Sequence, residues 1–439
     1  MSDLQRSFQK SKLARFPLEP PMPLNSHLGA LDEIDDEEGQ DDLGGEENDI
    51  DSRMDTPSSP CSSASSTSTI RPLFARPEPR KKASLEPLPW NQYFSSSLYL
   101  LHEPTSAVFH AYLTSPTNNG PLFVTHHGAG SSGLSFALLA SEIRKILPAA
   151  GVLSFDSRGH GETKTPNDED LSLPTLSQDF VTVVELAKEK CGWGKMPDLV
   201  LVGHSLGGAV VADVAMGGKL GGNVLGYVVL DVVEGSAIDA LQSMQTYLST
   251  RPSGFTSLAQ GIECTRSRTI RNPASARVSV PALLLSDTTP SESSGDSSPS
   301  RPWRWRTDLA KTQPFWQGWF VGLSKKFLQA RGGKLLILAG TDRLDRELII
   351  GQMQGKYQLV VLPEVGHFLH EDAPGKTAGS VSFFFSFHFF LFVEGDGDRK
   401  RRGLMGEVGT GGWEQLVEFY KRNDRSALVL PPKVSDMYK

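Results

Sequence analysis

The chain has little cysteine, no long apolar run and no excess of basic residues. Its 439 residues include only three cysteines, too few and too scattered for a disulfide framework, which fits a reducing compartment. The first residues lack the apolar run of a signal peptide, and no stretch approaches the roughly twenty apolar residues that span a bilayer. We therefore expect a soluble protein of the cytoplasm or nucleus with no membrane partner.

The net charge of −7 arises from one acidic segment. Residues 31–51 hold twelve of the 51 acidic residues and no basic residue, so the acidity is local. No basic face elsewhere predicts nucleic acid binding. Residues 1–86 as a whole are acidic and then rich in Ser, Thr and Pro, with too few apolar side chains to offset the entropy of ordering. We expect this region to be disordered and one domain to occupy residues 87–439.

Beyond residue 87, short apolar stretches alternate with stretches of helical periodicity. This alternation is typical of an α/β fold with a mostly parallel central sheet flanked by helices. A hairpin is expected first, followed by buried strands at Pro121–Thr125, Val152–Phe155, Leu199–Val202, Tyr227–Leu230, Leu335–Leu338 and Gln358–Leu362. The predicted hairpin strands are Tyr99–His102 and Ala107–Leu113, and the predicted helices are Ser135–Leu147, Leu176–Lys190 and Ala209–Met216.

About a hundred residues separate the sixth and seventh predicted strands, far more than a crossover needs. We expect residues 232–330 to form an inserted cap, with a disordered polar loop near residues 286–302. Four aromatic residues lie toward its end, and packing within the cap is a better explanation for them than substrate binding. They are Phe315, Trp316, Trp319 and Phe320.

A phenylalanine-rich segment at residues 378–412 is the second irregularity. It separates an apparent helix start, Glu371–Lys376, from an apparent helix body, Glu414–Tyr420. Removing the segment would join these halves into one amphipathic helix. We interpret it as an insertion foreign to the fold.

The strongest chemical motif is Gly203-His204-Ser205-Leu206-Gly207, a G-x-S-x-G pattern. It directly follows a predicted strand and directly precedes a predicted helix. A sharp turn in this context exposes the serine hydroxyl at the helix N-terminus. Ser205 is therefore the candidate nucleophile.

A serine hydroxyl needs a base to take its proton, and histidine is the usual one. His367 follows the last predicted strand, where folds of this kind place the base. A carboxylate must then orient the imidazole. Asp231 and Asp342 both end predicted strands after the nucleophile, and spacing alone slightly favours Asp342.

Acyl transfer also needs two donors for the oxyanion. One candidate is the backbone N–H of Leu206. The other is expected from the turn His126-His127-Gly128-Ala129-Gly130, with Gly128 or Ala129 as the donor. The sequence contains no phosphate-binding loop and no metal-ligand spacing, so we expect no cofactor and no metal.

With these residues in order, the chain resembles the α/β-hydrolase superfamily, and within it the protein phosphatase methylesterase 1 family. The resemblance covers roughly residues 87–376. It rests on long strings, namely DVVEGSAIDAL at 231–241, IRN at 270–272, SARVS at 275–279, GTDRLD at 340–345 and GQMQGK at 351–356.

The resemblance implies a serine esterase that removes the methyl ester from the C-terminal leucine of the type 2A protein phosphatase catalytic subunit. It implies that Ser205 is the nucleophile, His367 the base and Asp231, rather than Asp342, the acid. Two alternatives remain open from the residues alone. One is an esterase or lipase acting on a small-molecule ester, and the other is a catalytically impaired protein that binds the phosphatase.

Overall fold

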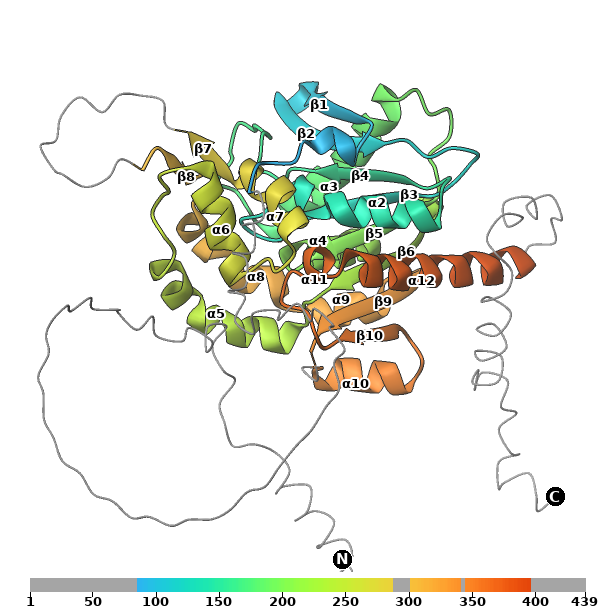
Figure 1. The fold of residues 1–439 in the computed structure, drawn as a ribbon. Coiled ribbons are helices and arrows are strands. Elements are labelled where there is room, and N and C mark those ends of the chain that lie inside the picture. The colour runs from blue at the N-terminus through green and yellow to red at the C-terminus, as the bar shows by residue number, and fades with distance from the viewer. Residues whose placement is uncertain (1–84, 287–300, 341–343, 396–439) are drawn as a thin grey trace, which may run out of the picture. The chain divides into compact units, whose positions relative to one another are not determined.

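The computed structural model describes residues 85–286, 301–340 and 344–395, with side chains described up to residue 385 (Figure 1). Nearly all of the region predicted to be disordered, residues 1–86, lies outside these ranges, as do most of the polar loop at 286–302 and the candidate acid Asp342.

An eight-stranded sheet runs through the domain in the order β1-β2-β4-β3-β5-β6-β9-β10. The strands β1 and β2 form the expected hairpin, β2 also pairs antiparallel with β4, and every later pairing is parallel. The strand bounds are β1 Ser96–His102, β2 Ala107–Thr114, β3 Leu122–His126, β4 Gly151–Phe155, β5 Leu199–His204, β6 Val224–Leu230, β9 Gly333–Ala339 and β10 Gln358–Leu362. This is the predicted α/β class.

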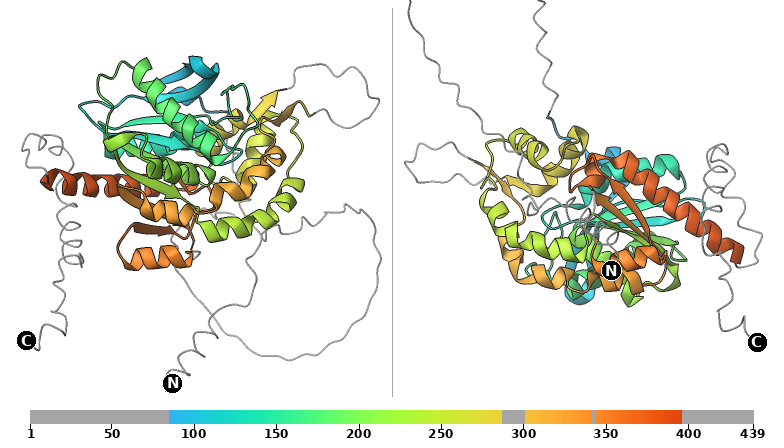
Figure 2. Two further views of the ribbon diagram at one scale, coloured as in Figure 1. Left: turned by 180° about the vertical axis from the view of Figure 1, so that it is seen from behind. Right: turned by 90° about the horizontal axis from the view of Figure 1, so that it is seen from below.

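The central strands are mostly apolar because helices cover both faces of the sheet. Every residue of β3, β4 and β5 is buried. Two helices, α2 (Ala137–Ile146) and α12 (Pro374–Gly395), pack together over one face. The opposite face carries α3 (Leu173–Lys190), α4 (Leu206–Gly217) and α9 (Leu323–Gln329), as the two views of Figure 2 show.

The segment between β6 and β9 contains most of the remaining elements. Figure 1 places them at the end of the sheet where the parallel strands finish. They are α5 Glu234–Ser249, α6 Leu258–Arg268, α7 Pro273–Ser279, β7 Leu284–Ser286, β8 Trp303–Trp305 and α8 Trp316–Phe320. The short strands β7 and β8 pair with each other in a separate two-stranded sheet. Two further helices, α10 Arg346–Met353 and α11 Leu369–Asp372, flank β10 in the chain.

The start of the phenylalanine-rich segment belongs to helix α12, which continues through residue 378 without a break. That the segment is an insertion foreign to the fold stays a prediction. Val381 and Phe384 are buried, and Phe385 packs edge-on against Phe123 of β3. These apolar side chains, with Ala378, therefore belong to the helix face that covers the sheet. The later part of the segment, from residue 396, lies outside the described residues.

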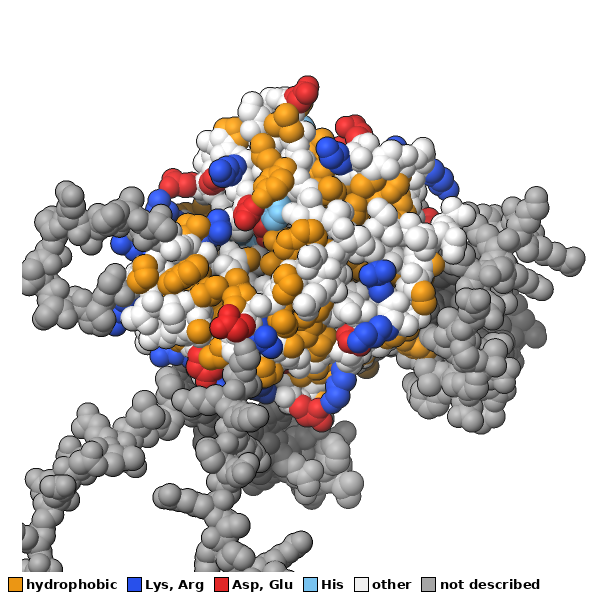
Figure 3. Space-filling view, turned by 45° about the horizontal axis from the view of Figure 1, so that its top comes forward, with side chains coloured by type: hydrophobic (Ala, Val, Ile, Leu, Met, Phe, Trp, Pro, Cys, Tyr) orange, Lys and Arg blue, Asp and Glu red, His pale blue; other side chains and the backbone are white. Residues whose placement is uncertain are grey.

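Charges of both signs are interspersed over the face drawn in Figure 3, with apolar patches between them. Among the described helices, none is both long and apolar enough to cross a bilayer.

Candidate active site

Ser205 lies in the tight turn between β5 and α4. Its backbone has φ 54° and ψ −119°, a conformation that a non-glycine residue adopts only under strain from its surroundings. The turn is closed by close backbone approach, since a Cβ on Gly207 would lie 2.1 Å from the carbonyl oxygen of His126. This approach places the first N–H groups of α4 beside the end of β3.

His367 and Asp231 are joined by a hydrogen bond. The ring Nδ1–H of His367 donates to Asp231 Oδ2 at 2.7 Å, and the backbone N–H of Ala339 donates to Asp231 Oδ1 at 2.7 Å. Asp231 follows β6 directly and has φ 53°, so its backbone is also held in the left-handed region. Both carboxylate oxygens therefore have a donor, and among the described residues the imidazole Nε2 of His367 has no hydrogen-bond partner.

His204, the residue before Ser205, holds the loop that carries His367 beside the serine. The ring Nε2–H of His204 donates to the carbonyl oxygen of His367 at 2.9 Å, and the two rings lie 4.7 Å apart. The Ser205 hydroxyl has no hydrogen-bond partner in the described part of the chain. Hydrogen bonds of catalytic groups commonly tighten only when substrate binds.

The turn after β3 supplies further backbone donors next to Ser205. A Cβ on Gly128 would lie 3.2 Å from the Cβ of Ser205, so a side chain at this position would crowd the serine. Within the described residues, no hydrogen bond takes up the N–H of Gly128, Ala129 or Leu206. The first N–H groups of a helix lack partners within the helix, so Leu206 and this turn offer donors around one point.

Two buried histidines hold this turn in place. His127 Nδ1–H donates to the carbonyl of Gly128 at 2.8 Å, and His127 Nε2 accepts from the N–H of Ser157 at 2.9 Å. His160 Nε2 accepts from the N–H of Gly130 at 2.9 Å. Burial lowers the pKa of both histidines, and a neutral ring is what these paired donor and acceptor roles require.

His204 and His370 form a second buried layer behind the site. Their rings lie 4.4 Å apart, and burial lowers the pKa of His204 well below its usual value and that of His370 to about 3. Neither supporting role was predicted from the sequence, because no pattern near a histidine shows which distant residue it will contact. Both side chains are buried, and that of His370 is fully buried.

The cap aromatics are packing residues in the structure. Trp316 and Trp319 are buried, and their indole N–H groups donate to Thr312 Oγ1 at 2.6 Å and to the carbonyl of Leu171 at 2.7 Å. Both belong to the core cluster that includes α3 and α4. The observed contacts thus agree with the packing interpretation rather than with a substrate-lined groove.

A strained serine between a parallel strand and a helix, with a histidine and a carboxylate at the ends of later strands, defines the α/β-hydrolase class. The chain matches the alpha/beta hydrolase family over residues 122–380. A solved structure, that of E-2-(acetamidomethylene)succinate hydrolase, has the same fold, with a TM-score of 0.52 and 17% identity over 66% of this chain and 99% of that chain.

Proteins of similar sequence identify the family within this class. Protein phosphatase methylesterase 1 of Aspergillus oryzae is 54% identical over all of this chain and 93% of its own length. The protein of the same name from Gibberella zeae is 53% identical over all of this chain and 99% of its own length, and that of Cryptococcus neoformans 38% identical over 99% and 95%. The chain belongs to the protein phosphatase methylesterase 1 family.

Proposed function

We propose that the protein is a serine esterase that removes the methyl ester from the C-terminal leucine of the type 2A protein phosphatase catalytic subunit. The relatives' name supports a phosphatase substrate, and the strings quoted above support this particular terminus. The single observation that carries the chemistry is the 2.7 Å hydrogen bond between His367 Nδ1 and Asp231 Oδ2. His204 holds the loop that carries His367 beside Ser205.

In the proposed reaction His367 Nε2 takes the proton of the Ser205 hydroxyl as the oxygen attacks the ester carbonyl. Asp231 keeps the imidazole in the tautomer with the proton on Nδ1 and stabilises the imidazolium that forms. His367 then returns the proton to the methoxy oxygen, and methanol leaves. Water attacks the acyl-enzyme by the same route and frees the leucine carboxylate.

The N–H of Leu206, with that of Gly128 or Ala129, would bind the oxyanion of each tetrahedral intermediate. Removing one such donor costs about 3 kcal/mol of transition-state stabilisation in related sites. The positive end of α4 points at the same place and adds to this stabilisation. Each donor is positioned before the reaction, so little reorganisation is needed as charge develops.

The test is a mass-spectrometric assay of methyl loss from the phosphatase C-terminus. Purified protein should demethylate the terminus, and Ser205→Ala should not. Labelling by a fluorophosphonate checks the nucleophile independently, with wild type labelled and Ser205→Ala unlabelled. A labelled enzyme that hydrolyses a short fatty-acyl ester but leaves the phosphatase methylated would favour a small-molecule esterase. Absence of labelling in the folded protein would favour a binding protein without turnover.

A further inference from the structure

The loop that carries His367, residues 363–368, connects the end of β10 to the start of α11. The position of the imidazole depends on this loop, and a small displacement of a catalytic group is costly. His204 holds the loop through the carbonyl oxygen of His367. A second set of contacts joins the same loop to the cap segment, the part of the chain between β6 and β9.

Asp372 joins the His367 loop to the cap segment through two main-chain donors. Its Oδ2 accepts from the N–H of Gly366, the residue directly before His367, at 2.8 Å. Its Oδ1 accepts from the N–H of Arg271, which precedes α7 of the cap segment, at 2.7 Å. The side chain of Asp372 is only 3% exposed. Hydrogen bonds to a carboxylate are shorter and stronger than those between neutral groups, so this buried link is a firm one.

The side chain of Arg271 adds a weaker link to the same loop. Its Nη1–H donates to the carbonyl oxygen of Glu364 at 2.9 Å, and its Nε lies 4.0 Å from Asp372 Oδ2. The loop is therefore held at residue 364 through a carbonyl and at residue 366 through an N–H. The Arg271 side chain is 65% exposed, so we expect this link to contribute less than the buried carboxylate.

The part of the cap segment that binds Asp372 is itself held in place. The side chain of Asn272 caps the first turn of α7. The hydroxyls of Ser275 and Ser279, on α7, donate to Glu371 Oε2 at 2.8 and 2.7 Å. Two successive carboxyl groups at the end of α11, those of Glu371 and Asp372, thus accept hydrogen bonds from the cap segment. The donor that Asp372 uses on this side has a fixed position.

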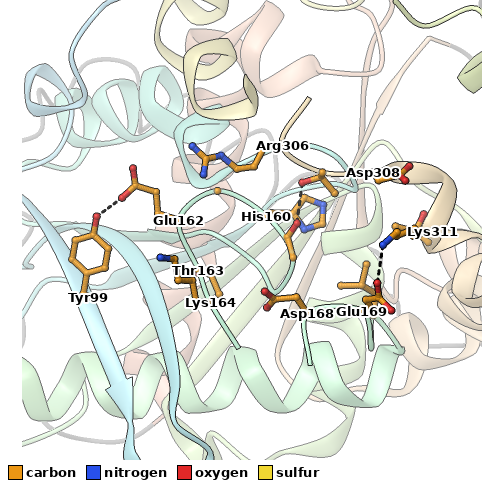
Figure 4. A pocket seen from close by; sticks show the side chains of 15 residues that line it. Tyr99, His160, Glu162, Thr163, Lys164, Asp168, Glu169, Arg306, Asp308 and Lys311 are labelled. Carbon is orange, nitrogen blue, oxygen red and sulfur yellow. Dashed lines mark hydrogen bonds and ion pairs between the residues drawn. The ribbon is translucent and has the colours of Figure 1, made fainter. Parts of the chain in front are cut away.

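The cap segment also approaches the turn that carries the proposed oxyanion donors, where the side chain of Leu309 lies against Gly130. A cavity of about 560 Å³ lies there, between the loop that follows β4 and the part of the cap segment that follows β8 (Figure 4). The ion pair drawn at this cavity joins Lys311 to Glu169 at 2.8 Å, and the two side chains are 63% and 74% exposed. Ion pairs this exposed contribute little. Of these two polar links between the cap segment and the rest of the domain, the one at Asp372 is the buried one.

We propose that Asp372 is a positioning residue for His367. By accepting the N–H groups of Gly366 and Arg271, it fixes the His367 loop against the cap segment. The imidazole can then meet both Asp231 and the nucleophilic serine. The proposal rests on the proposed function, because it takes His367 as the base. The cap segment is, on this proposal, part of the support of the base.

The experiment compares full-length wild type with Asp372→Asn, whose amide keeps the size of the side chain but offers one acceptor oxygen in place of two. On a peptide methyl ester ending in leucine, we expect kcat to fall about tenfold or more and KM to change by less than about twofold. Fluorophosphonate labelling of Ser205 should slow in parallel. The downfield proton NMR signal of the hydrogen bond from His367 to Asp231 should shift or disappear.

Arg271→Ala is a milder variant of the same contact, because it removes the donor to Glu364 but keeps the main-chain N–H that Asp372 accepts. It should lower kcat by about two- to threefold, and Arg271→Lys should recover most of that loss. Asp170→Asn is the matched control. The Asp170 carboxylate also accepts a main-chain N–H, that of Ser172 at 3.1 Å, but it lies in the turn before α3. Its replacement should leave kcat and the NMR signal as in wild type.

Wild-type kcat and an unshifted NMR signal in Asp372→Asn, shown to be folded by circular dichroism, would overturn the inference. So would lower thermal stability with kcat and labelling rate unchanged, because that result would show a purely structural role. If Asp372→Asn does not fold, Arg271→Ala decides, and a kcat equal to that of wild type would count against the proposal.

Failure of the proposed function gives a different result. A wild type that is labelled at Ser205 but hydrolyses no leucine methyl ester would count against the proposed substrate alone. The NMR signal depends on no substrate, so its response to Asp372→Asn tests the positioning of His367 even then. The signal is assigned by its absence from Asp231→Asn.

Discussion

His204 Nε2–H donates to the carbonyl oxygen of His367 at 2.9 Å, so the residue before the proposed nucleophile holds the loop of the proposed base. His204 is buried, and burial keeps its pKa far below neutral, so this donor does not change with pH in the physiological range. The contact joins the end of β5 to the loop after β10, two segments 163 residues apart in the chain.

Replacing His204 should therefore impair catalysis without touching a reacting group. We expect His204→Phe, which keeps a ring but removes the donor, to lower kcat about tenfold or more, because small misplacement of a catalytic group is costly. KM should change little. Steady-state kinetics together with circular dichroism would check this, and full activity in a folded His204→Phe would contradict it. His204→Gln, which keeps an N–H donor, should recover part of kcat.

Asp231 is the second position to test. Asp231→Asn should lower kcat by about 10⁴, because an amide can hold the imidazole in the wrong tautomer and leaves the imidazolium without a counter-charge. Fluorophosphonate labelling should slow in parallel. Asp239→Asn, an exposed carboxylate on α5, is the matched control and should behave as wild type. If Asp231→Asn retained near-normal kcat, the proposed role of Asp231 would be wrong.

The sheet and the serine turn were predictable because both leave local signals. Apolar runs ended by glycine or histidine mark buried strands, and G-x-S-x-G between a strand and a helix marks the turn at Ser205. The choice between the two candidate acids, by contrast, depends on contacts between residues that are far apart in the sequence. Spacing slightly favoured Asp342, which lies outside the described residues, whereas Asp231 accepts a hydrogen bond from His367, 136 residues later in the chain.

The supporting histidines were missed for the same reason. His127 and His160 fix the turn after β3 through hydrogen bonds to residues about thirty positions away. No pattern in the surrounding sequence predicts those hydrogen bonds. In helix α12 the composition alone did not predict packing, since Phe384 of the phenylalanine-rich segment is buried.

The burial of Trp319 predicts a loss of stability rather than of substrate affinity. Trp319→Ala should lower the free energy of unfolding by about 3–5 kcal/mol, because it opens a cavity and leaves the Leu171 carbonyl without its donor. Thermal denaturation would measure the change. Trp319→Phe should lose less, since most of the apolar volume remains. A raised KM with unchanged thermal stability would restore a role for this side chain in substrate binding.

Glu371 gives the stability a specific pH dependence. Its side chain lies in α11, fully buried, and Oε2 accepts from the hydroxyls of Ser275 and Ser279 at 2.8 and 2.7 Å. Oε1 has no partner among the described residues. Burial, and to a smaller extent the charge of Asp372, raise the pKa of Glu371 from 4.5 to about 8. The folded protein therefore keeps this carboxyl protonated at pH values where the unfolded chain has lost the proton.

The sign of the effect follows from proton binding. Between pH 4.5 and about 8 the folded state binds more protons than the unfolded state, so this group's contribution to stability falls as pH rises through that window and then levels off. Each unit of raised pKa corresponds to about 1.4 kcal/mol. Glu371→Gln mimics the neutral acid and should remove this fall, so its stability relative to wild type should increase from pH 5 to pH 8. Denaturant titrations at several pH values would measure the difference. Glu185→Gln, at an exposed position on α3, should follow the wild-type profile, and parallel curves for wild type and Glu371→Gln would show that the buried carboxyl does not titrate in this range.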